Sequence, residues 1–173
     1  MTDILTLKAR RNIYNIVKKN PGLHLSKIAD LLNMRISHVE YHLFYLEKYD
    51  LVFSIMEEKY KRYYPKSINL GLQDRNTLSI IRREIPLTII LFLLKNPRST
   101  HKKILEQVSI SKSTLSYHLK TLVERQILEI VIAEHEKTYR VKDKEYIEKL
   151  LHRFKPYSAI ESFEDIFLDF SVK

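Results

Sequence analysis

The chain repeats itself once at a spacing of 76 residues, and this repeat constrains the fold more than any other feature. Asn20-Pro21 recurs as Asn96-Pro97, and Tyr41-His42-Leu43 recurs as Tyr117-His118-Leu119, with no gap in the alignment. Between residues 13 and 63, fourteen positions are identical to the residue 76 positions later. Two copies are too few for a solenoid, which needs at least about three repeats. The repeat therefore predicts two small domains in tandem.

Both copies show the same order of predicted elements. A first helix ends at Asn-Pro, since proline restricts the residue before it. A short helix, a turn and a longer helix follow, and the apolar spacing then changes to the alternation of strands. The predicted short helices are 25–32 and 102–108, the longer helices 37–48 and 112–125, and the strands 51–56, 61–64, 127–133 and 137–141. The predicted fold class is mainly α with small β-hairpin wings (α+β).

The repeat also predicts the domain boundaries. We expect one winged domain at residues 1–66, a linker and connecting helix at 67–85, a second winged domain at 86–142, and a C-terminal helical segment at 143–173. The longest apolar run, 85–94, is about half as long as a membrane-spanning helix must be, so we expect a buried helix there. We expect no membrane segment and a cytoplasmic location.

Composition excludes cysteine-based sites and most nucleotide-binding enzymes. The chain has no cysteine, which removes thiol nucleophiles, iron–sulfur centres and zinc ribbons. Its two glycines are too few for the clustered glycines of nucleotide-binding loops. His38 and His42 are four residues apart, a spacing that can chelate a metal, but His42 stands next to a predicted core leucine and we expect it to pack instead. We predict no cofactor, no metal and no catalytic site.

The charge favours a polyanionic partner. Thirty Lys and Arg residues against 21 Asp and Glu give a net charge of +9. The surplus is +5 in residues 1–66 and +6 in residues 67–142, whereas residues 143–173 carry −2. Basic surfaces of this kind bind nucleic acid through phosphate contacts and counterion release.

Two segments resemble a known family. Residues 37–46 (SHVEYHLFYL) and 113–122 (STLSYHLKTL) resemble the recognition helix of ArsR/MarR-type regulators. The two-copy arrangement is similar to archaeal tandem winged helix-turn-helix transcriptional regulators. The resemblance implies a regulator that binds double-stranded DNA, with its recognition helices in the major groove and its wings on the flanking backbone.

The resemblance places candidate DNA contacts in both copies. In the second copy these lie on the long helix, the short helix and the wing: Lys112, Ser113, Thr114, Ser116, Tyr117, Lys120, Lys102, Lys103, Lys137 and Arg140. Ser111 is the expected N-cap of that long helix. In the first copy the corresponding candidates are Arg35, Ser37, His38, Tyr41, Lys59, Lys61 and Arg62.

The first copy is open to a second interpretation. Glu40 on its long helix could accept a hydrogen bond from cytosine, but it would repel phosphates otherwise. Its aromatic residues could instead be buried against the other domain or a second subunit. The alternative function is therefore a non-catalytic docking subunit of a protein complex, as in chromosome-condensation or transcription-machinery adaptors.

The C-terminal segment suggests self-association. Within 160–170, apolar residues recur on one predicted helix face: Ile160, Phe163, Phe167 and Phe170. Exposed phenylalanines of this number are unfavourable in water. We therefore expect either packing onto the chain's own domain or a homodimer contact.

Overall fold

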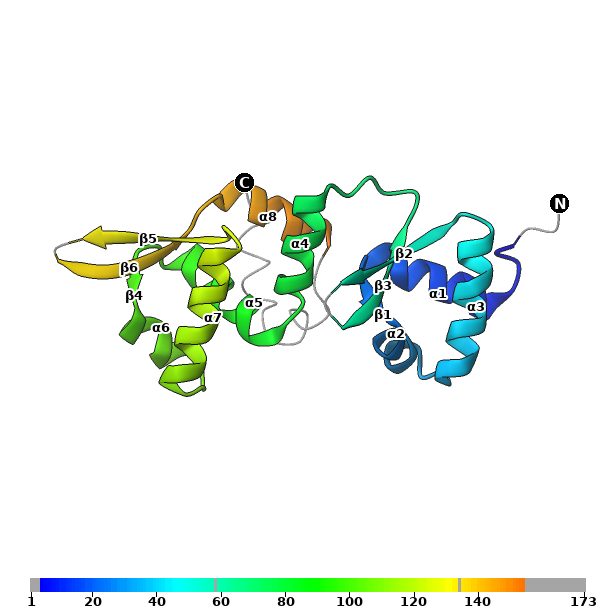
Figure 1. Ribbon diagram of the computed structural model, residues 1–173, viewed down its shortest axis with the longest axis horizontal. Coiled ribbons are helices and arrows are strands. Elements are labelled where there is room, and N and C mark those ends of the chain that lie inside the picture. Colours follow the sequence, from blue (N-terminus) through cyan, green and yellow to red (C-terminus); the bar gives the residue numbers. More distant parts are fainter. Residues whose placement is uncertain (1–3, 58, 134, 155–173) are drawn as a thin grey trace. The chain divides into compact units, whose positions relative to one another are not determined.

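A computed structural model describes residues 4–57, 59–133 and 135–154 (Figure 1). The chain forms two compact units, residues 1–75 (unit 1) and 76–173 (unit 2). The division falls inside helix α4 (Leu72–Ile81), within the segment 67–85 expected to hold a linker and connecting helix. The predicted helical face at 160–170 lies outside the described residues.

Unit 1 is a helix triplet followed by a β-hairpin. In chain order it comprises α1 (Lys8–Lys19), β1 (Leu23–His24), α2 (Leu25–Leu32), α3 (Ile36–Lys48), β2 (Val52–Glu57) and β3 (Tyr60–Pro65). Helix α1 ends at Asn20, immediately before Pro21, as the Asn-Pro pair predicts. The three strands form an antiparallel sheet in the order β1-β3-β2.

Unit 2 repeats this order and adds a helix at each end. After α4 it comprises α5 (Glu84–Lys95), β4 (Ser99–Thr100), α6 (His101–Gln107), α7 (Lys112–Glu124), β5 (Leu128–Ala133), β6 (Glu136–Val141) and α8 (Lys144–Arg153). Asp143 caps α8, since its side chain accepts a hydrogen bond from the Tyr146 backbone N–H at 2.9 Å. The α+β class, mainly helical with two hairpin wings, is confirmed.

The spacing of 76 residues is preserved in the strand register. Leu23 pairs with Tyr63 in unit 1, and Ser99 pairs with Tyr139 in unit 2. Each sheet thus has a third strand, β1 or β4, that the sequence pattern did not predict. Both are only two residues long, too short to show strand alternation.

Each unit has its core between the helices and the sheet. In α3 the buried residues are Val39, Leu43 and Leu46, and in α7 they are Leu115, Leu119 and Leu122, as the apolar spacing predicts. The apolar run 85–94 forms most of α5, whose apolar residues are almost all buried. Among the described residues, no helix is long and apolar enough to cross a membrane.

Candidate nucleic-acid interface

Helix α7 begins with a capped and solvent-exposed turn. The Ser111 hydroxyl accepts a hydrogen bond from the Thr114 backbone N–H at 3.1 Å, which confirms the predicted N-cap. With the leucine face buried, the opposite face is left for a partner. Its exposed members are Lys112, Ser113, Ser116, Tyr117 and Lys120, whereas Thr114 is half-buried.

A polar chain joins α6 to this face of α7. His101 begins α6, and its Nε2 lies 3.0 Å from the Ser116 hydroxyl. That hydroxyl donates to the Lys112 carbonyl oxygen at 3.0 Å. Because its single proton is used there, His101 donates from Nε2 in this arrangement. The contact holds the start of α6 against the start of α7.

Strand pairing places the wing beside this point, because Thr100, next to His101, pairs with Thr138, next to Lys137. Burial, followed by the positive charges of Lys112 and Lys137, lowers the pKa of His101. Lys112 belongs to α7 and Lys137 to β6. Three elements therefore bring cationic or hydrogen-bonding side chains to one surface of unit 2, which we call the α7 face (His101, Lys112, Ser116, Lys120 and Lys137).

The other predicted contacts of unit 2 lie around this surface. Lys102 and Lys103 are both exposed on α6. Lys103 lines a cleft of about 500 Å³ together with Lys95 and Arg98, at the end of α5. Arg140 is half-buried and forms an ion pair with Glu129 at 2.5 Å on the neighbouring strand. A phosphate would have to compete with that carboxylate for Arg140.

Helix α3 of unit 1 offers a different surface. Arg35 precedes it at the N-cap position, and no side-chain hydrogen bond caps the helix. Arg35, Ser37, His38 and Tyr41 are exposed. The edge of Tyr41 contacts Tyr45, with ring centroids 4.9 Å apart, and the Arg10 guanidinium lies 4.7 Å from the centre of the Tyr45 ring.

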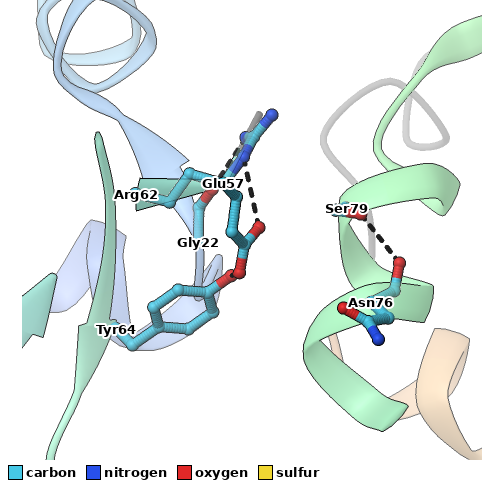
Figure 2. A network of polar contacts seen from close by, with 6 residues as sticks. All are labelled: Gly22, Glu57, Arg62, Tyr64, Asn76 and Ser79. Atoms are coloured by element: carbon cyan, nitrogen blue, oxygen red, sulfur yellow. Dashed lines mark hydrogen bonds and ion pairs between the residues drawn. The ribbon is translucent and has the colours of Figure 1, made fainter. Parts of the chain in front are cut away.

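The predicted phosphate contact at Arg62 requires a correction. Arg62 is only 8% exposed, and its guanidinium donates to the Gly22 carbonyl oxygen at 3.0 Å. It also forms an ion pair with Glu57 at 3.4 Å, and Glu57 in turn accepts from the Tyr64 hydroxyl (Figure 2). Arg62 therefore braces the sheet of unit 1 and is not available to DNA.

The two wing lysines of unit 1 differ from each other. Lys61 forms an ion pair with Glu47 of α3 at 3.1 Å, whereas Lys59 is exposed at the start of the hairpin's second strand. Sequence reasoning did not predict the Glu47 contact. The two residues are fourteen positions apart, and only the folding of the wing against α3 brings them together.

The histidines in the middle of α3 and α7 are half-buried. Burial, followed by the charges of Arg10 and His38, lowers the pKa of His42. Burial, followed by the charge of Arg83, lowers the pKa of His118. Packing of His42 and His118 against the core agrees with the sequence-based expectation. Within the described ranges, no group of three or more His, Asp or Glu side chains is arranged to hold a metal ion.

Comparison with known proteins agrees with this architecture. A family model for an N-terminal HTH domain matches residues 7–78, and a model for winged helix-turn-helix DNA-binding matches residues 74–129. The uncharacterized HTH-type transcriptional regulator MJ1398 of Methanocaldococcus jannaschii is 33% identical over 119 residues. The match covers 69% of this chain but only 29% of that relative, so the chain spans less than a third of its length.

A solved structure is more distant. The DIP2311 protein of Corynebacterium diphtheriae is 14% identical, with 79% of this chain and 27% of that chain covered and a TM-score of 0.32. A TM-score of that size adds nothing to the fold described above. The two family matches, together with the helix triplets and their wings, show that the chain carries two helix-turn-helix domains in tandem, each with a β-hairpin wing.

Proposed function

We propose that the chain is a non-enzymatic, cytoplasmic transcriptional regulator, in which unit 2 reads double-stranded DNA. Helix α7 enters the major groove, and its N-terminal half meets the base edges. Lys112, Lys120 and Lys137 contact phosphates on either side of it. The wing β5–β6 lies on the flanking backbone.

One observation carries the proposal: the composition of the α7 face. The helix has no carboxylate before its last residue, Glu124, which forms an ion pair with Lys120 at 3.8 Å, so its N-terminal half presents no negative charge to phosphate. Lys112 and Lys137 both lie near enough to His101 to lower its pKa, after burial. A cationic surface around small hydroxyl side chains favours a polyanion with hydrogen-bonding base edges.

The contacts proposed for unit 2 are therefore a defined set: Lys102, Lys103, Lys112, Ser113, Thr114, Ser116, Tyr117, Lys120, Lys137 and Arg140. In unit 1, Arg35, Ser37, His38 and Tyr41 stay a prediction for DNA contact.

Reversing two charges on the α7 face tests the proposal. Lys112→Glu with Lys120→Glu removes two phosphate contacts, so we expect at least about a tenfold weaker affinity and a salt slope about 2 units shallower. Fluorescence anisotropy would measure both, on the duplex upstream of the chain's own gene and a shuffled duplex, at about 50 and 200 mM salt. Preference for the upstream duplex at the higher salt indicates a sequence-specific site.

A matched control separates position from net charge. Lys18→Glu with Lys19→Glu makes the same change in charge at two exposed residues of α1. We expect this variant to keep the wild-type salt slope. If both double variants lose affinity equally, or if neither does, α7 is not the reading helix.

A further inference from the structure

A groove separates α3 from the wing in unit 1. It has a volume of about 370 Å³. Its lining includes Glu40, Phe44 and Glu47 of α3, which we call the α3 wall, and Lys59, Tyr60 and Lys61 of the hairpin, which we call the wing wall. The remaining lining residues are Tyr63 and the segment 24–26. Phe44 and Tyr60 are 60% and 49% exposed, so an aromatic side chain on each wall is open to solvent; we call these two rings the apolar strip. A surface of this kind marks an interaction site when its apolar residues are contiguous and rimmed by charge.

The equivalent positions of unit 2 carry the opposite character. Ile36, Glu40 and Phe44 correspond, at the spacing of 76, to the Lys112, Ser116 and Lys120 of the α7 face. Ile36 is itself 51% exposed. Where unit 2 has Lys112 and Lys120, unit 1 has the apolar residues Ile36 and Phe44, and where unit 2 has a serine hydroxyl, unit 1 has the Glu40 carboxylate. In unit 2 these positions lie on the side of the helix that we propose to face phosphates. This side of α3 is therefore suited to a partner other than DNA.

The charges of the groove are divided between its walls. The α3 wall is acidic and the wing wall is basic. Tyr63 also lines the groove. Burial raises the pKa of its hydroxyl, the charge of Lys61 lowers this pKa, and the charges of Glu47 and Glu40 raise it further. Charged residues of both walls therefore lie near this hydroxyl. Lys61 and Glu47 already neutralise each other at 3.1 Å. Among the described residues, Glu40 makes no hydrogen bond or ion pair, and Lys59 is exposed at the opposite wall.

We propose that this groove is a self-association surface whose occupant is a second copy of the same chain. A two-fold axis through the groove sets the acidic wall of each protomer against the basic wall of its partner. Glu40 of one chain then pairs with the partner's Lys59, and the same pair forms a second time. Between the two pairs, Phe44 and Tyr60 are covered by their counterparts, which removes the exposed apolar strip from water.

A second copy of the chain is the expected partner because the charges of this surface are complementary to those of the same surface after a two-fold rotation. The groove has an acidic wall on one side of the apolar strip and a basic wall on the other. When a second copy is related by a two-fold rotation, each acidic wall faces a basic wall, so both charges are paired. Lys59 is thereby assigned to the partner chain and not to a phosphate. The inference goes beyond the proposed DNA-binding function and does not depend on it, since association is measured without DNA.

The mass of the intact chain in solution is the first test. Analytical ultracentrifugation over about a hundredfold dilution should show a dimer of twice the 20.7 kDa chain mass that dissociates on dilution. Phe44→Lys places in α3 the residue that unit 2 has at this position, and it should raise the dissociation constant at least about tenfold. Its circular dichroism spectrum should match that of the wild type, because the site is exposed.

Mixing two charge variants identifies the contact. Glu40→Lys alone and Lys59→Glu alone each set like charges against each other in a homodimer, so each should be monomeric. In an equimolar mixture, Lys at position 40 of one chain faces Glu at position 59 of the other, and Glu40 faces Lys59, so a heterodimer should form. An intramolecular role for either residue gives no recovery on mixing.

Two outcomes would overturn the proposal. One is a wild-type chain that stays monomeric over the whole dilution series. The other is a dimer that persists in both single variants, or one that mixing does not restore. Phe163→Ser with Phe167→Ser serves as the control, because loss of the dimer there would instead assign self-association to the C-terminal segment.

Discussion

Four histidines have lowered pKa values for the same main reason, although they lie in different elements. The pKa of each is lowered, and burial is the largest cause for His24, His42, His101 and His118. The unfolded chain therefore takes up protons at these sites more readily than the folded chain. Their contribution to stability is present above the ordinary histidine pKa of 6.5 and is lost as the pH falls below it.

His24 gives this effect a structural readout. Its Nδ1 accepts a hydrogen bond from the Lys27 backbone N–H at 3.3 Å and so caps α2. Its ring stacks on the Tyr60 ring, with the two ring centroids 4.8 Å apart. Protonation removes the acceptor. His24→Asn keeps a capping oxygen, so we expect near wild-type stability at pH 7.5 and a smaller loss on acidification to pH 5.5.

Urea unfolding at the two pH values would measure that difference. His135→Asn is the control, because His135 is an exposed histidine in the turn of the other wing. Equal acid sensitivity in wild type and His24→Asn would show that this cap does not contribute to the pH dependence.

At the scale of the element, the corresponding helices α3 and α7 differ in how they begin. Ser111 caps α7 through the Thr114 N–H, whereas Arg35 leaves α3 without a side-chain cap. The backbone is extended at both positions, with φ and ψ of −69° and 154° at Ser111 and −64° and 137° at Arg35. A serine at position 35 therefore meets a backbone already suited to capping.

Removing the cap of α7 and adding one to α3 should shift the free energy of unfolding in opposite directions. Ser111→Ala should lower the free energy of unfolding by about 1 kcal/mol, and Arg35→Ser should raise it by about the same amount. Native-state hydrogen exchange at the α7 and α3 amides would report each change in its own unit. A shift of the same sign in both variants would contradict the assignment of the caps.

The wing shows how an element depends on side chains that are distant in the sequence. Lys61 and Arg62 are neighbours in the chain, yet one is exposed and paired with Glu47 while the other is buried against Gly22 and Glu57. Alternation along β3 predicts that adjacent side chains point to opposite faces, but not which face is buried at the end of a hairpin. The helices packed against the hairpin, α1 and α3, decide that.

At the scale of the whole molecule, unit 2 is larger than the predicted domain 86–142. Helix α4 buries Leu78, Ile80 and Ile81, and the Tyr146 hydroxyl of α8 contacts Thr77 Oγ1 at 3.4 Å. Helix α8 itself buries Ile147, Leu150 and Leu151. Each such side chain contributes about 1.5–3 kcal/mol when fully buried, against a total stability of about 5–15 kcal/mol for a domain.

Two fragments would test where the folding unit ends. We expect residues 67–173 to fold alone and to show a cooperative thermal transition by circular dichroism. Residues 86–142 lack α4 and α8 and should show no such transition. A cooperative transition in the shorter fragment would instead support 86–142, the boundaries predicted from the repeat, as the limits of the folding unit.

The sequence alone determined the repeat, the order of the helices and the buried faces of α3 and α7. These follow from local rules: Asn20-Pro21 and Asn96-Pro97 end helices, and leucines at spacings of three and four define one face. The exposed residues of α7 were predictable for the same reason, since the residues opposite a buried stripe on a helix must face outward.

Only the tertiary structure decided which charges remain available. The burial of Arg62, the pairing of Lys61 with Glu47 and the contact of His101 with Ser116 each join residues from different elements. The groove of unit 1 likewise forms only where the wing packs beside α3. Such contacts depend on how helices and strands pack against each other. The spacing of apolar residues within one element does not predict which residues of another element will lie beside it.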